Sequence, residues 1–412
     1  MSVQGDGRRL KILLVAPNVS QKMGGEALKA LQIHQGLRAN GHQVRQIAHA
    51  RVKSEMESDF PELSFEYIPD DPVQVWLNHR GIHPALAMLN AWQLHRLARR
   101  VASDMRPDIV HFTSPISPVL PYFRLVGQHV VIGPLNGNLP HPPALREREP
   151  LFKKIGAAIL RPLQVFLGLL FRGKRFALVL VSGGDRTMRA LRFGGVTTGR
   201  MVPTLDSGIL DTVFCRPRAV HSGPNGRFVF LGRLVAYKGC DLAIRALLHA
   251  PDTVTLDIIG DGVERNRLVA LAAELELEAR VRFRGWSRPG EDLYDQLGQY
   301  RGMVVPSLAE ANGIVFQEAM VLGLPIICVD WGGPSEILTQ AEAIMIEPRS
   351  ELFIIDSLAR ALTLLSEDAS VAEALSVRAR DRAVKMGFRW SELLRSWEDV
   401  YLRAARDLPV KR

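Results

Sequence analysis

One stretch of the chain, EANGIVFQEAMVLGLPIICVDWGG at residues 310–333, constrains the fold more than any other. It holds two carboxylates eight residues apart, Glu310 and Glu318, then small and apolar residues, a Gly-Leu-Pro turn and the apolar segment 326–329. Together with the apolar segment 303–306, this pattern predicts a strand, a loop, a helix and a buried strand of one parallel sheet. The loop would follow the carboxyl end of a strand, where ligands bind in open α/β sheets.

The same stretch indicates a phosphate site with acids beside it. A helix that begins near Gly313 directs unpaired backbone N–H groups, those of Ile314 and Val315, toward a bound anion. Carboxylates are poor ligands for phosphate but good acceptors for sugar hydroxyls, so Glu310 and Glu318 favour a sugar phosphate. Alternatively, both are solvated glutamates at a helix entry, where acids are common. For an isolated pair, the second explanation is the more frequent one.

The surrounding pattern favours the sugar phosphate. E-x-N-G-I-V-x-x-E-A-M-x-x-G-x-P resembles the signature of retaining glycosyltransferase family 4, which includes the group 1 glycosyltransferases of bacterial surface polysaccharide synthesis. The resemblance implies an α/β protein of the GT-B fold, with two Rossmann-like doubly wound parallel-sheet domains that face each other across a deep cleft. The family usually has an aromatic residue before the glycine, where this chain has Asn312, so we expect different contacts there.

A second motif supplies cations. The apolar segment 228–231 is followed by Gly-Arg and, five residues beyond Arg233, by Lys238 and a glycine. Arg binds phosphate oxygens through two donors and Lys adds a point charge, although two such cations alone would be ordinary solvated loop residues. The segment resembles the family's G-R-x-x-x-x-K-G motif, which implies that Arg233 and Lys238 contact the diphosphate of a donor.

The N-terminal part begins like a nucleotide-binding fold. Residues 11–48 read as strand, Gly24-Gly25, helix, Asn-Gly-His turn and strand. Adjacent glycines let the backbone approach a ligand in front of a helix, but a flexible turn explains them equally well. There is no G-x-G-x-x-G, so a nicotinamide cofactor is not indicated. By resemblance, Gly24 and Gly25 contact the donor's phosphates.

Polar residues of the first half are candidates for the acceptor side. His111 ends the segment P-D-I-V-H, which is familiar in the family, although a lone His at a strand end is more often structural than catalytic. The loop PLNGNLPHPP is rich in Pro, Gly and Asn, and its candidates are Asn136, Gly137, Asn138 and His141. Some family members place an active-site His in this part of the first domain, which makes His141 a candidate catalytic residue.

Length and composition predict two domains. A chain of 412 residues is too long for one ordinary core. We predict an N-terminal acceptor domain at 1–205, a turn-rich linker at 206–226 and a C-terminal donor domain at 227–389. The resemblance implies that the last helix, in 390–412, packs back on the first domain.

The charge lies unevenly along the chain. Residues 1–200 contain 27 Lys and Arg against 14 Asp and Glu, and the remaining residues contain 25 against 29. A basic half fits an anionic substrate, a membrane surface or nucleic acid, but no nucleic-acid motif accompanies it. The segment 151–175 is both apolar and basic, and Arg161-Pro162 interrupts it, so it is too broken to span a bilayer. It is either an ordinary core helix or, as we favour, an amphipathic segment on anionic lipid.

The predicted compartment is the cytoplasm, at the inner face of the membrane. Three cysteines without metal-ligand spacing indicate a reducing environment. The first apolar run is too short for a signal peptide and is typical of a strand.

These observations predict a retaining hexosyltransferase that moves a sugar from a nucleoside diphosphate sugar to a lipid-linked saccharide, as in lipopolysaccharide synthesis. Arg233, Lys238 and the amides after Gly313 would stabilise the departing diphosphate without a metal or another cofactor. The resemblance implies that Glu310 holds the sugar hydroxyls and Glu318 the ribose hydroxyls. Two other classes stay open: a nucleotide-sugar epimerase of the same fold and a non-catalytic glycan- or nucleotide-binding relative.

Overall fold

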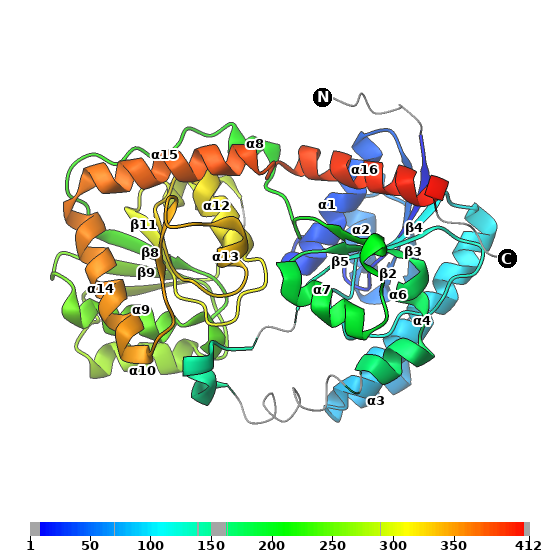
Figure 1. Ribbon diagram of the computed structural model, residues 1–412, viewed down its shortest axis with the longest axis horizontal. Helices are drawn as coiled ribbons and strands as arrows, with labels where there is room; N and C mark the ends of the chain where they lie inside the picture. The colour runs from blue at the N-terminus through cyan, green and yellow to red at the C-terminus, as the bar shows by residue number, and fades with distance from the viewer. Residues whose placement is uncertain are drawn as a thin grey trace. The chain divides into compact units, whose positions relative to one another are not determined.

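The computed structural model describes residues 9–69, 71–137, 140–149, 162, 164–288 and 290–407. They form two compact units (Figure 1), one from the described residues within 1–138, 155–207 and 390–412, the other from those within 139–154 and 208–389. This differs from the predicted division in two places, because residues 140–149 and residues 208–226 of the expected linker 206–226 both belong to the second unit. Asn138 and residues 151–161 and 163 of the segment 151–175 lie outside the described residues.

The first unit is built on a parallel sheet of seven strands in the described part of the chain, in the order β3-β2-β1-β4-β5-β6-β7. The strands are β1 Lys11–Val15, β2 Gln43–His49, β3 Phe65–Ile68, β4 Ile109–Phe112, β5 Val130–Leu135, β6 Leu178–Val181 and β7 Met201–Pro203. The helices are α1 Gly25–Ala39, α2 Lys53–Asp59, α3 Pro72–His79, α4 His83–Met105, α6 Gly173–Phe176, α7 Gly184–Phe193 and α16 Trp390–Asp407.

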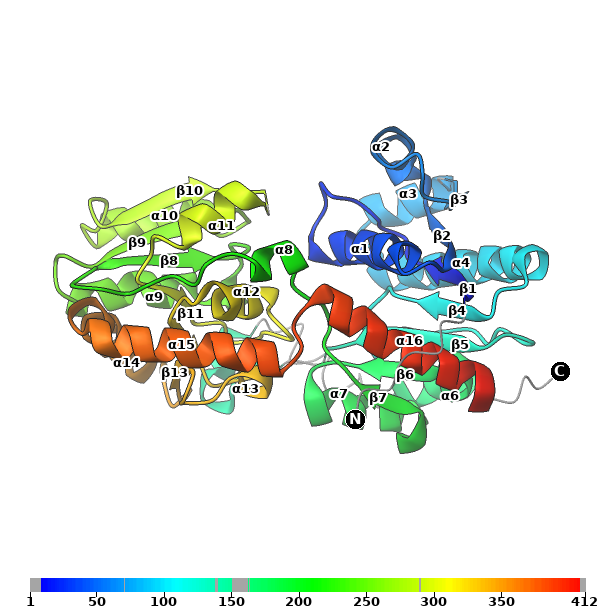
Figure 2. The same ribbon diagram turned by 90° about the horizontal axis from the view of Figure 1, so that it is seen from above.

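Helices cover both faces of this sheet, as its continuous apolar strands require (Figures 1 and 2). The α4 helix places Leu94, Ala98 and Val101 against one face, at the spacing of one side of a helix. The other face packs against α1 and α16, where Trp397 and Tyr401 are fully buried. The last helix thus belongs to the core of the first unit.

The second unit contains a parallel sheet in the order β10-β9-β8-β11-β12-β13. Its strands are β8 Arg227–Leu231, β9 Thr255–Ile259, β10 Val281–Gly285, β11 Gly302–Val305, β12 Ile326–Val329 and β13 Ala343–Ile346. Its helices are α8 Asp211–Phe214, α9 Cys240–Ala246, α10 Arg265–Glu274, α11 Glu291–Leu297, α12 Ile314–Leu322, α13 Pro334–Ile337, α14 Glu351–Glu367 and α15 Ala369–Lys385.

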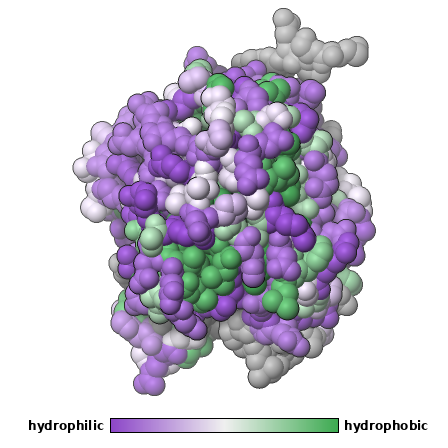
Figure 3. All heavy atoms as spheres, turned by 90° about the vertical axis from the view of Figure 1, so that its left-hand side faces the viewer, coloured by the Kyte–Doolittle hydropathy of each residue, from purple (hydrophilic) through white to green (hydrophobic). Residues whose placement is uncertain are grey.

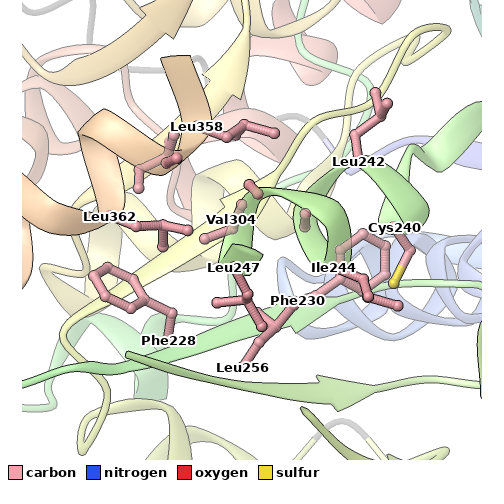
Figure 4. Packing of buried hydrophobic residues seen from close by; sticks show 14 of the residues in the cluster. Phe228, Phe230, Cys240, Leu242, Ile244, Leu247, Leu256, Val304, Leu358 and Leu362 are labelled. Atoms are coloured by element: carbon pink, nitrogen blue, oxygen red, sulfur yellow. The ribbon is translucent and has the colours of Figure 1, made fainter. Parts of the chain in front are cut away.

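The core of the second unit lies between the sheet and the helices α9 and α14. Figure 4 shows Phe228, Leu256 and Val304 of three strands in one cluster with Ile244 of α9 and with Leu358 and Leu362 of α14. All of these side chains are buried. Burial of this apolar surface is the main stabilising contribution of the fold.

Each sheet has one point at which the strand order reverses. The chain runs outward from β1 to β3 and returns at β4, and it runs outward from β8 to β10 and returns at β11. In open α/β sheets, ligands bind at the carboxyl ends of the strands that flank such a point. The loops after β8 and β11 therefore form the expected ligand-binding site of the second unit.

Candidate active site

Two predicted residues, Lys238 and Glu310, meet beside this reversal. Lys238 ends a short 3-10 turn after β8, and Glu310 lies in the loop after β11. The ammonium group of Lys238 donates to the carboxylate of Glu310, and the two side chains are only 15% and 11% exposed. A cation and an acid are thus held together at the carboxyl edge of the sheet.

Backbone contacts fix the positions of both loops. The Leu308 N–H donates to the Tyr237 carbonyl at 2.8 Å, and the Gly333 N–H donates to the Glu310 carbonyl at 2.7 Å. Gly239 has φ +67°, and a Cβ at this position would lie 2.3 Å from the Pro306 oxygen. Only glycine fits at this position, which explains why glycine follows Lys238 in the motif.

Tyr237 connects the two cations of the motif. Arg233 Nη2 donates to the Tyr237 hydroxyl at 3.0 Å, and Lys238 Nζ lies 6.0 Å from the centroid of the same ring. Arg233 itself is exposed. Tyr237 was not among the residues predicted from the sequence, although its place between the two cations was a usable signal.

The α12 helix begins beside Glu310 as the sequence predicts. Gly313 precedes it with φ +59° and gives it no side-chain cap. The N–H groups of a first helical turn have no acceptor within the helix, so those of Ile314 and Val315 are available to an anion. No acid lies in this first turn, which would otherwise repel one.

Glu318 lies further along α12 and is buried. Tyr294 of α11 donates its hydroxyl to Glu318 Oε1 at 3.1 Å, and the Arg216 guanidinium lies 5.8 Å from the Tyr294 ring. Burial raises the pKa of Glu318 to about 7, and the Tyr294 hydrogen bond opposes that rise. Tyr294 was not identified from the sequence because it comes from a helix remote in the chain.

Glu318→Gln should stabilise the protein at pH 8. Because the folded-state pKa is raised from 4.5 to about 7, the folded state binds more protons than the unfolded state between these values. This contribution to the free energy of unfolding therefore falls as pH rises from 4.5 to 7, by up to about 3 kcal/mol. Urea unfolding of the variant should show less of this pH dependence, whereas the exposed Glu336→Gln should retain it. Equal profiles for the two variants would contradict the assignment.

In the first unit, Gly24 and Gly25 lie at the start of α1 as predicted. Gly24 has φ −62°, and a Cβ on either residue would meet nothing within 4 Å. The local backbone does not require glycine here, and the space in front of it is open. Their contact with a donor stays a prediction.

His111 is buried within the first unit. Its Nδ1 lies 2.8 Å from the Tyr401 hydroxyl and its Nε2 lies 2.8 Å from the Gly133 oxygen. Burial lowers the pKa of His111 to about 4, so the ring is neutral at neutral pH. These contacts are typical of a structural histidine, and a role of His111 on the acceptor side stays a prediction.

The loop after β5 divides between the two units. Asn136 is buried in the first unit, and its N–H donates to the Ile116 oxygen at 2.9 Å. Gly137 has φ +147°, and a Cβ there would lie 3.0 Å from Pro118. Both residues therefore have local structural roles, and their contact with an acceptor stays a prediction.

His141 belongs to the second unit, which corrects its predicted place in the first domain. It is buried, and its Nδ1 lies 3.8 Å from Glu149 Oε1. Arg148 in the same segment forms ion pairs with Asp241 and Glu351, and Leu145 enters the core of the second unit. Sequence order alone assigned the segment to the first domain, whereas these side-chain contacts attach it to the second.

The second unit matches a known family. Residues 216–382 match the family Glycosyl transferases group 1. The chain is 35% identical over 149 residues to the lipopolysaccharide core biosynthesis glycosyltransferase LpsD of Rhizobium meliloti, covering 36% of this chain and 41% of that protein. It is 27% identical over 238 residues to the D-inositol 3-phosphate glycosyltransferase of Xylanimonas cellulosilytica, covering 57% and 56%. The chain thus spans about half the length of the curated relatives it matches.

Solved structures match almost the whole chain. The structure of Anabaena Alr3699/HepE in complex with UDP and glucose has a TM-score of 0.67 and 19% identity, covering 96% of this chain and all of that one (100%). At this identity, the likeness concerns the fold. The chain therefore has the two-domain GT-B fold, and its second unit is similar to the glycosyl transferases of group 1.

Proposed function

We propose that this protein is a retaining glycosyltransferase that moves a sugar from a nucleoside diphosphate sugar to a saccharide acceptor. The observation that carries the proposal is the Lys238–Glu310 pair beside the uncapped start of α12, at the reversal of the second sheet. Cation, carboxylate and helix amides are the three groups that a sugar diphosphate requires.

In this proposal, each group of the site binds a different part of the donor. Lys238, Arg233 and the amides of the first turn of α12 stabilise the negative charge that develops on the departing diphosphate. Glu310 accepts hydrogen bonds from the sugar hydroxyls and holds the reacting carbon in place. Glu318 accepts hydrogen bonds from the ribose hydroxyls. No metal or additional cofactor has a part in this set.

The acceptor that we propose is a lipid-linked saccharide of a bacterial surface polysaccharide. The similarity to a lipopolysaccharide core glycosyltransferase supports it. The basic charge of the first 200 residues also fits an anionic membrane surface, where such an acceptor is found. The proposed location is the inner face of the cytoplasmic membrane.

The direct test is the release of nucleoside diphosphate. Purified protein is incubated with a panel of nucleotide sugars, with and without a lipid extract as the acceptor source. We expect release from one donor class to increase when the extract is added. Conversion of the donor sugar to its epimer without release would identify an epimerase, and binding without either reaction would identify a non-catalytic relative.

A further inference from the structure

The helical residues 164–170 expose apolar side chains to solvent, whereas an ordinary surface helix exposes its polar side chains. Gln164 and Gly168, one turn apart, are buried, and the Gln164 amide donates to the Ala190 oxygen of α7. A Cβ at Gly168 would lie 2.5 Å from the Gly194 oxygen. The polar and the small residue therefore form the contact with the rest of the unit.

Four of the five apolar residues of this helix are exposed, and the fifth, Leu167, is half-buried. Phe166 and Leu170 are each 61% exposed, and Val165 and Leu169 are also exposed. Single exposed apolar side chains are common, but four within one short helix need a partner. A water-facing helix would place Gln164 outward and these four inward.

Ring contacts connect this helix to α4. Phe171 lies 5.0 Å from Phe123, and Phe123 lies 5.2 Å from His95 of α4. Trp92 precedes His95 by three residues and therefore lies on the same side of α4, where it is exposed. The Arg96 guanidinium lies 5.5 Å from the Trp92 ring. We define the apolar–basic face as Phe166, Leu169, Leu170, Trp92, Arg96 and Arg172.

The neighbouring helix α3 repeats the arrangement of α4. It packs against α4, and its Trp76 is exposed with the Arg80 guanidinium 5.8 Å from the ring. Tryptophan beside a cationic side chain is the combination found at the boundary between lipid headgroups and acyl chains. The two packed helices α3 and α4 thus each expose one such pair.

Basic residues outnumber acids in the segments around this face, although Asp71 accepts a hydrogen bond from Gln93 of α4. Residues 72–103 contain Arg80, Arg96, Arg99 and Arg100 but no Asp or Glu, and residues 150–184 contain Lys and Arg but no acid. Near the helix, the Arg124 guanidinium lies 4.2 Å from the Phe176 ring. A protein partner with a mixed surface does not require such a sequence, whereas anionic lipid does.

We infer that the apolar–basic face of the first unit binds the surface of an anionic lipid bilayer. Phe166, Leu169 and Leu170 enter the boundary region, and the arginines contact lipid phosphates. No helix among the described residues is long and apolar enough to cross a bilayer, and this mode of binding needs none. The inference deepens the proposed function and rests on it for the reason why lipid is the partner.

The test measures binding of the full-length protein to lipid vesicles by flotation, in the absence of donor and acceptor. We expect flotation with vesicles of phosphatidylcholine and phosphatidylglycerol, less flotation at high salt, and none with phosphatidylcholine alone. Phe166→Ser/Leu170→Ser should weaken binding about tenfold or more, because two inserted apolar side chains are lost. Arg96→Gln should weaken it less.

A matched control comes from the second unit. The face of that unit in Figure 3 is mostly hydrophilic with separate apolar patches, and Leu352 and Val263 are 74% and 88% exposed. Leu352→Ser/Val263→Ser should bind vesicles like the unchanged protein. Absence of vesicle binding, or equal loss in both double variants, would overturn the inference, as would association with a protein through this face instead. Release of diphosphate from soluble donor is measured in parallel, so failure of the proposed function is distinguished from failure of lipid binding.

Discussion

Lys238→Met should lower kcat for sugar transfer by about 10²–10³-fold, the effect of removing one preorganised group that stabilises developing charge. Lys238 is the partly buried cation at the carboxyl edge of the second sheet, and the departing diphosphate would develop its charge there. Glu310→Gln should lower kcat as well, because a neutral amide holds the sugar hydroxyls less strongly than a carboxylate does. Steady-state kinetics with the donor identified by diphosphate release gives both values.

The double variant Lys238→Met/Glu310→Gln separates catalysis from folding. Each single change leaves one partner of a partly buried ion pair alone, which itself destabilises the protein. The double variant removes that penalty, so it should unfold like the unchanged protein but remain as slow as the slower single variant. Arg349→Met breaks the exposed Arg349–Glu347 pair, 2.6 Å apart, and should leave kcat unchanged. A Lys238→Met variant with kcat within about threefold of the unchanged protein would remove Lys238 from the mechanism.

Gly260→Ala should destabilise the second unit by about 3–5 kcal/mol. Gly260 follows β9 with φ +152°, and a Cβ there would lie 1.9 Å from the Gly232 oxygen of the loop after β8. That loop is held by a hydrogen bond from the Gly232 N–H to the Ile259 oxygen at 3.0 Å, so it does not move away without losing this bond. Urea unfolding followed by circular dichroism measures the loss.

Gly223→Ala is the matched control for backbone strain. Gly223 has φ +66°, but a Cβ at this position would meet nothing within 4 Å. The free energy of unfolding of Gly223→Ala should fall by only about 1–2 kcal/mol, the cost of placing a residue with a Cβ in the left-handed backbone conformation. If the two alanine variants lose the same stability, then the close approach of the two loops is not what requires glycine at position 260.

The sequence was most informative where the residues of one short segment are enough to predict its secondary structure. The segment 310–333 contains its loop, helix and strand in order, and the structure has α12 at Ile314–Leu322 and β12 at Ile326–Val329. Buried parallel strands are continuous apolar runs, and helix starts are marked by glycine, so both are visible locally. Lys238 and Glu310 both lie in loops that follow strands of this sheet, and because parallel strands end at one edge, the two loops lie on the same side of it.

The sequence was least informative where packing between distant segments decides the outcome. His111 was a candidate for the acceptor side, and its Nδ1 lies 2.8 Å from the hydroxyl of Tyr401, which is 290 residues away in the chain. His141 follows a strand of the first unit, but its segment is attached to the second through Arg148 and Leu145. Neither contact has a signature in the local pattern, because both depend on which surfaces meet after the chain has folded.

The sequence by itself determined the strand, loop, helix and strand around residues 303–329 and placed Arg233, Lys238 and Glu310 in loops after apolar strands, and its family resemblance implied the two-domain GT-B fold. Periodicity, glycine placement and strand direction are local properties, and they suffice to predict these local elements. Only the tertiary structure decided that Tyr237 and Tyr294 contact the site residues, that His111 is buried, and that helix 164–170 exposes four of its apolar side chains. Burial and side-chain contact are properties of the packed chain, so they become visible only when its distant parts are in place.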